Sequence, residues 1–177
     1  FYCNRWKMLG DIADVLREIN KDTVKIILEI YTKDKPTDKQ NKLLNDGRSS
    51  FIRGGVSQAE LAYKYGQADI ALHVESLDMR NKLATRYSFS TKIIDCLFSG
   101  CAVMAYCWDR HSGFTYLKKR DAAICVSSRI ELKEVLQKIC DDKNIIADAA
   151  RRAYICGNTY HNKNKVQKML LDDMNNC

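Results

Sequence analysis

The chain has 177 residues, a formal net charge of +7 and a hydrophobic fraction of 46%. That length suits one domain, and that composition is typical of a globular protein, so long disordered or fibrous chains are excluded. No apolar run approaches the roughly 20 residues that span a bilayer, and residues 1–10 are not expected to act as a secretion signal, because Arg5 and Lys7 interrupt them. The basic residues are scattered rather than grouped with aromatic ones, so no nucleic-acid partner is expected.

Eight cysteines raise the question of a disulfide framework, but their placement argues against one. No two are spaced C-x-x-C, so neither a zinc motif nor a redox motif is expected. Thiols within apolar strands or helices behave as small hydrophobes. We therefore expect reduced thiols and a cytoplasmic protein. Five cysteines lie in such apolar patterns: Cys96, Cys101, Cys125, Cys140 and Cys156.

The first third of the chain alternates helix and strand signals. Residues 1–3 resemble the end of a strand, which suggests that the sequence is part of a longer chain. Residues 7–20 carry apolar side chains at helical spacing, and residues 24–31 predict a short β-branched strand. Residues 33–41 are polar and contain the only proline of the sequence, so they predict a surface loop. Residues 50–53 predict a second strand.

The next segments carry clearer end signals. Ser57 is followed three residues later by Glu60, which predicts a capping box and a helix that ends at Gly66. Residues 68–74 are apolar almost throughout, which indicates a strand in a sheet that is covered on both faces. Residues 75–88 are polar and follow the carboxyl end of that strand.

The second half continues the alternation. Residues 89–99 predict a helix, residues 102–106 and 122–126 predict buried strands, and the chain from about residue 130 is mostly helical. Such an alternation predicts an α/β fold with a Rossmann-like parallel sheet and helices on both of its faces. In sheets of this kind, ligands bind at the carboxyl ends of the strands.

Four segments, in order, resemble the donor domain of retaining GT-B glycosyltransferases of family four. Residues 54–61 (GGVSQAEL) resemble its glycine turn into a helix, and residues 68–76 (ADIALHVES) resemble its strand that ends in Glu-Ser. Residues 89–105 (FSTKIIDCLFSGCAVMA) resemble its helix and following strand, and a helical tail, residues 158–177, comes last. The resemblance implies that residues 1–177 are one nucleotide-sugar-binding domain of a two-domain enzyme, whose N-terminal acceptor domain is the missing partner.

The same resemblance implies what the domain binds and does. The donor would be a UDP- or GDP-linked sugar, transferred with retention to a glycan or lipid-linked acceptor in the synthesis of a cell-surface glycan. No metal and no other cofactor is expected, and the sequence has no D-x-D acid pair. The isolated domain is expected to be inactive. It would be cytoplasmic, with peripheral contact to the inner face of the membrane.

Asp95 and the helix start before it would bind the nucleotide. A carboxylate accepts strong hydrogen bonds from ribose hydroxyls, and Asp95 stands where the family has Glu, so a bridging water is the alternative to direct contact. Ser90, Thr91 and Lys92 begin the helix, whose N–H groups and dipole favour a diphosphate. The alternatives are an ordinary first-turn acid for Asp95 and a solvated lysine for Lys92.

Three further residues would lie near the phosphates and the sugar. Arg5 and Lys7 stand in for the Arg and Lys that hold the phosphates in the family, and the alternative is that they are frayed terminal residues. Glu75 resembles the first acid of the family's paired-glutamate motif, near the transferred sugar, and is the candidate catalytic residue. Its alternative role is a loop carboxylate paired with Arg80 or Arg86.

The base and a lid complete the expected site. The resemblance puts Val56 and Gln58 beside the base, with a core valine and a helix first-turn residue as the alternatives. Residues 77–87 form an insertion relative to the family, and long segments at a ligand rim are often functional. We therefore treat them as a candidate mobile lid.

Other chemistries find less support. His73, His111 and His161 are not spaced as a ligand set, and His73, within an apolar strand, is expected to be a structural histidine with its hydrogen bonds satisfied. No G-x-S-x-G elbow and no P-loop is present. Two rival functions stay open: a GT-B enzyme of the sugar-nucleotide epimerase kind, and a non-enzymatic nucleotide-binding α/β module.

Overall fold

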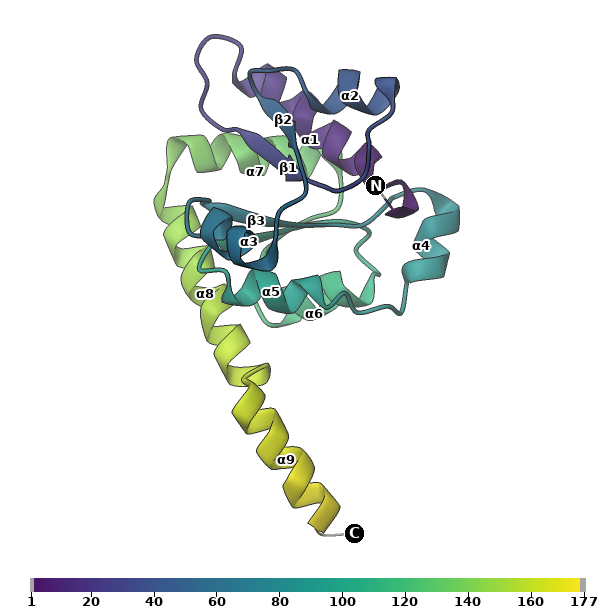
Figure 1. The fold of residues 1–177 in the computed structure, drawn as a ribbon. Helices are drawn as coiled ribbons and strands as arrows, with labels where there is room; N and C mark the ends of the chain where they lie inside the picture. The colour runs from purple at the N-terminus through teal and green to yellow at the C-terminus, as the bar shows by residue number, and fades with distance from the viewer. Residues whose placement is uncertain (1, 176–177) are drawn as a thin grey trace.

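The computed structural model describes residues 2–175. Two small parallel sheets form its middle, and helices cover them on both sides (Figure 1). The predicted α/β, Rossmann-like arrangement is therefore confirmed. One expectation is corrected: the strands form two sheets rather than one, and within residues 2–175 no strand pair joins the two.

All strand pairs are parallel. In the first sheet, β1 (Leu28–Tyr31) pairs with β2 (Ser50–Arg53). In the second sheet, β4 (Ala102–Tyr106) lies between β3 (Ile70–Val74) and β5 (Ile124–Val126).

One hydrophobic core joins the two sheets. Met104 and Tyr106 of β4 point into it, together with Leu28 of β1. The amphipathic helices α1 (Arg5–Ile19) and α7 (Arg129–Asp141) supply most of its other side chains. Because α1 packs against both β1 and β3, side chains rather than strand hydrogen bonds hold the sheets together.

A second core lies on the opposite face of the larger sheet. Val103 and Ala105 alternate with the residues of the first core and point to this face. Three helices cover it: α5 (Lys92–Phe98), α6 (Ser112–Lys119) and α8 (Asn144–Tyr160). With both faces covered, every residue of β4 is buried.

The helix α3 (Gln58–Tyr65) follows its sequence signals. The Ser57 side chain accepts from the Glu60 N–H, and the Glu60 side chain accepts from the Ser57 N–H, so the predicted capping box is confirmed. The helix ends at Gly66, as expected.

Three short helices were not predicted from the sequence. They are α2 (Asp38–Leu44), in the expected loop, α4 (Met79–Thr85), in the polar stretch after β3, and α6. Each begins at a polar cap: Thr37, Asp78 and His111 accept a hydrogen bond from a first-turn N–H group. These caps, rather than an apolar stripe, mark where the helices start.

Two predicted strand segments are also corrected. Tyr2–Asn4 form a 3-10 turn rather than a strand end, with left-handed φ values of 54° at Cys3 and 59° at Asn4; Phe1 lies outside the described residues. The strand expected from residue 24 begins only at Leu28. The reason is Asn20, whose side-chain oxygen accepts from the backbone N–H groups of residues 25 and 26.

The last helix, α9 (Lys163–Asn175), leads away from the body of the molecule (Figure 1). Residues 158–175 of the predicted tail are mainly helical, as the end of α8 and α9, and residues 176–177 lie outside the described part. Met169, Leu170 and Met174 are exposed on α9. Among residues 2–175, no helix combines the length and the apolar composition that crossing a bilayer requires.

Candidate functional site

Polar side chains gather where β3 and β4 end. The two strands pair in parallel with Val74 opposite Tyr106, and the Glu75 N–H extends the pairing by donating to the Tyr106 carbonyl at 3.3 Å. His73, Glu75 and Ser76 are all buried at this edge. Buried polar groups normally have hydrogen-bond partners. The residues that contact these three side chains therefore form the candidate site.

Glu75 is held by Arg5, the first residue of α1. Arg5 Nε donates to Oε2 at 3.0 Å and Nη2 donates to Oε1 at 2.5 Å, so the guanidinium grips both carboxylate oxygens. The Glu75 side chain is 3% exposed and that of Arg5 is 25% exposed. Two predicted site residues, 70 positions apart, are thus brought into contact, and the partner of Glu75 is Arg5 rather than Arg80 or Arg86.

The start of α5 carries the predicted nucleotide ligands on its surface. Ser90 is half-buried, and Thr91, Lys92 and Asp95 are exposed. Asp95 lies in the first turn of the helix, as predicted, and burial, then Cys96, then the charge of Asp95 raise the pKa of Tyr65 on α3. Its proposed bond to a ribose stays a prediction.

The Arg5–Glu75 contact does not include Lys7, Val56 or Gln58. Lys7 is exposed on α1, Val56 is half-buried between β2 and α3, and Gln58 is the exposed first residue of α3. The turn that holds Val56 therefore follows the smaller sheet, whereas Glu75 follows the larger one.

The insertion at residues 77–87 contains α4 and is tied down at its start. The Asp78 carboxylate accepts from the Ser76 hydroxyl at 2.7 Å, from Asn4 and from the Asn81 amide, and Asn81 also donates to the Cys3 carbonyl. The Ser76 bond is the largest reason that the pKa of Asp78 lies below its usual range. The segment is therefore anchored to the N-terminal turn, and its role as a lid stays a prediction.

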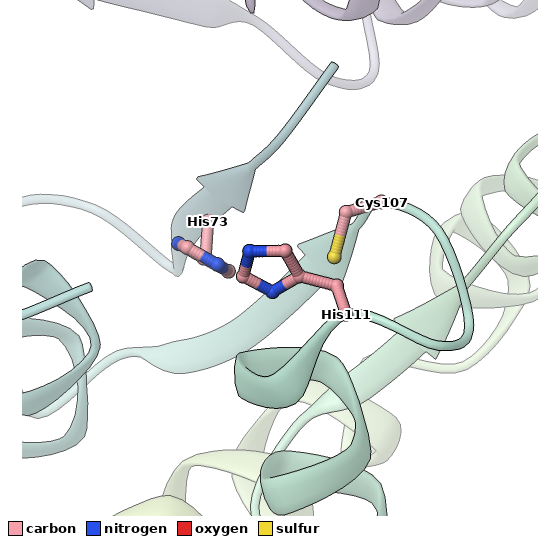
Figure 2. A group of neighbouring side chains, drawn as sticks. All are labelled: His73, Cys107 and His111. Carbon is pink, nitrogen blue, oxygen red and sulfur yellow. The ribbon is translucent and has the colours of Figure 1, made fainter. Parts of the chain in front are cut away.

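A cluster of three buried side chains lies beside the ion pair. His73 is on β3, Cys107 follows β4, and His111 is the N-cap residue before α6. One nitrogen of each imidazole and the Cys107 sulfur all lie within 4.8 Å of one another. Figure 2 shows the His73 ring and the Cys107 sulfur on either side of the His111 ring. We call these three residues the HCH cluster.

The electrostatics of the HCH cluster keep all three residues uncharged. Burial lowers the pKa of His73 to about 4 against an opposing effect of Glu75, and burial also lowers the pKa of His111. Burial raises the pKa of the Cys107 thiol, with Glu75 acting in the same direction. Each histidine also has a buried Nε2 with no hydrogen-bond partner among the described residues.

Sequence reasoning missed the HCH cluster. The expectation that the three histidines form no set is right for His161, which meets the Tyr116 hydroxyl at 2.8 Å, and wrong for the other two. The expectation that His73 is fully satisfied is also wrong, because its Nε2 is unpartnered. The available signal was positional: His73 lies near the end of β3 and Cys107 directly follows β4, and parallel pairing sets these strand ends side by side.

The comparisons with known proteins leave the family undecided. No protein-family model matches the chain, and no curated protein matches it. The glycosyltransferase resemblance therefore rests on its four sequence segments.

Two surface hollows lie away from this edge. One includes Asp121, which precedes β5, and Arg152 of α8; the other includes Ser49, which precedes β2, and Arg17 of α1. Both are next to the amino ends of strands. Because ligands of parallel sheets bind at the carboxyl ends, neither hollow replaces the candidate site.

Proposed function

We propose that this chain is the donor-binding domain of a retaining GT-B glycosyltransferase and binds a UDP- or GDP-linked sugar. The observation that carries the proposal is the Arg5–Glu75 ion pair at the carboxyl end of β3. Both residues were predicted from the resemblance, from segments far apart in sequence, and they meet at the edge where such sheets bind ligands.

The pair suits a diphosphate-sugar. A bidentate carboxylate holds a guanidinium in one orientation, and the planar guanidinium can donate to two charged oxygens of one group, as phosphate provides. Arg5 would stabilise the charge that develops on the leaving diphosphate. Glu75 would hold Arg5 in position and lie near the sugar. Transfer itself needs the acceptor domain, so catalysis depends mainly on how two domains orient donor and acceptor.

The rest of the site supports the same ligand. The helix α5 begins at Lys92 rather than at residue 89 as expected, so Thr91 is its N-cap and Ser90 precedes it, and Asp95 in its first turn is the candidate for the ribose hydroxyls. The proposed location is the cytoplasm, with peripheral contact to the inner face of a membrane that holds a lipid-linked or glycan acceptor. No nucleic acid is proposed as a partner.

Calorimetry with UDP and GDP tests the proposal. We expect weak binding of one nucleotide, weakened further by salt because screening reduces phosphate attraction. Asp95→Asn should lower the affinity by roughly 10- to 150-fold, the effect of losing about 1.5–3 kcal/mol from a charged hydrogen bond. Asp95→Glu should bind at least as well as the parent.

Asp38 offers a matched control, because it is also an exposed acid in a helix first turn. Asp38→Asn should bind like the parent. Absence of binding to both nucleotides at millimolar concentration would overturn the proposed function. Equal binding by Asp95→Asn and the parent would show that the ribose contact is assigned to the wrong residue.

A further inference from the structure

The HCH cluster contains buried polar atoms without partners, a feature that ordinary cores avoid. His73 and His111 are 4% and 2% exposed, and the Nε2 atoms of both lack hydrogen-bond partners among the described residues. Cys107, fully buried, brings a sulfur to the same place. A buried polar atom without a partner destabilises the fold, so a group that satisfies two such atoms at once stabilises it.

We propose that His73, Cys107 and His111 bind a Zn²⁺ ion. Zinc readily binds a donor set of two imidazole nitrogens and one thiolate. Zn²⁺ also has no geometric preference of its own from its d-electrons, so the protein can set the arrangement of the ligands. This inference does not depend on the proposed glycosyl transfer, and it departs from the sequence expectation that no metal is bound.

The spacing permits such a site after a small contraction. Zinc binds imidazole nitrogen at about 2.0–2.1 Å and thiolate sulfur at about 2.3 Å, so tetrahedral ligands stand roughly 3.3–3.6 Å apart. The cluster's ligand atoms lie within 4.8 Å. Side-chain rotations that draw them together by at most about 1.5 Å are sufficient.

Three protein ligands leave a fourth position for water or another small ligand. Glu75 is next to the cluster, but Arg5 already occupies both of its carboxylate oxygens. This pair contributes no net charge to the site. Binding of the ion converts the Cys107 thiol to a metal-bound thiolate and releases its proton to solvent.

Binding also changes the start of α6. His111 Nδ1 accepts from the Gly113 N–H at 3.2 Å and thereby caps the helix. If Nε2 binds the ion, Nδ1 carries the ring proton and can no longer accept; if the ring turns to present Nδ1, the same bond breaks. We therefore expect metal binding to release the Gly113 N–H in either arrangement.

The experiment uses the full chain after treatment with a chelator. Titration with Zn²⁺ should give one ion per chain, and Co²⁺ as a spectroscopic substitute should give a thiolate-to-metal charge-transfer band with tetrahedral visible bands. The melting temperature should rise with Zn²⁺, since an ion that binds only the folded state stabilises it. The amide signal of Gly113 should shift on binding.

Cys107→Ser and His73→Gln should remove the charge-transfer band or weaken Zn²⁺ binding by at least about tenfold. Cys125→Ser is the matched control, because Cys125 is a free cysteine of the same sheet outside the cluster, and it should bind like the parent. No stoichiometric Zn²⁺ binding by the parent, or a Co²⁺ spectrum without the thiolate band, overturns the proposal even if the variants fail to fold. The proposal is also overturned if Cys125→Ser loses Zn²⁺ binding while Cys107→Ser retains it.

Discussion

The buried ion pair between Arg5 and Glu75 can be compared with an exposed pair of the same chemistry, Arg53 with Glu29. In the first pair the Arg and Glu side chains are 25% and 3% exposed; in the second they are 45% and 41% exposed. Replacing Arg5 by Met keeps much of the side-chain volume but leaves the Glu75 carboxylate buried without its counter-charge. The matching control is Arg53→Met.

The exposed fractions set the expected magnitudes. Removing one partner of a fully buried pair typically destabilises a protein by about 3–5 kcal/mol. Because the Arg5 guanidinium is partly in contact with water, we discount this to about 2–3 kcal/mol for Arg5→Met. Arg53→Met should lower the free energy of unfolding by about 0–1 kcal/mol. Adding Glu75→Gln to Arg5→Met removes the stranded charge and should restore roughly 1–2 kcal/mol.

Urea denaturation followed by circular dichroism measures these differences, provided that the slope against urea is unchanged between variants. The reasoning fails if Arg5→Met is no more destabilising than Arg53→Met. It also fails if Glu75→Gln gives no recovery in the Arg5→Met background, because Glu75 would then not depend on the guanidinium.

Other features give smaller tests. A Cβ at Gly113 would lie 2.7 Å from Cδ1 of the buried Ile93, so Gly113→Ala should destabilise the fold by about 1–3 kcal/mol. Gly54 has open space around it, so the control Gly54→Ala should change the stability by less than about 1 kcal/mol. Thermal melts of the two variants measure the difference. Hydrogen bonds lower the pKa of the Asp78 carboxyl in the folded protein. They therefore stabilise the fold fully when the pH is above the unfolded-state pKa of about 3.9, and this stabilisation is lost as the pH falls below that value toward the folded-state pKa. Asp78→Asn should therefore make the free energy of unfolding depend less on pH in the acid range. The seven cysteines within residues 2–175 are free, so mass spectrometry after alkylation in denaturant without reduction should find them all modified.

The sequence predicted the elements whose signals are local. Strands β2 and β4 occupy the residues expected, and the Ser57–Glu60 capping box begins α3 as expected. The helices α2 and α4 were missed because each has only seven residues and one buried side chain or none, so no apolar stripe marks it. Helices of this length depend on caps and on docking rather than on their own propensity.

Pairing between distant segments was harder to predict. The pattern of apolar residues shows where a strand lies in the sequence but not which other strand it pairs with. The division of the strands into two sheets could therefore not be predicted from the sequence. The same limit applies to the site. The alternative role of Glu75 was an ion pair with nearby Arg80 or Arg86, whereas α1 brings Arg5 to it. His73 and Cys107 became neighbours only through parallel pairing of β3 with β4.

The division into two sheets has a mechanical consequence. Within residues 2–175 no strand pairing joins the smaller sheet to the larger one, so the packing of the shared core and the contacts at its rim resist a shift of α1, β1 and β2 against the larger sheet. At the carboxyl edge the Arg5–Glu75 pair and the Asn81 bond to the Cys3 carbonyl oppose such a shift, because they join the start of α1 and the turn before it to the segment after β3. A ligand that drew Arg5 away from Glu75 would remove one of these two links, so occupation of the edge would weaken the attachment between the two sheets.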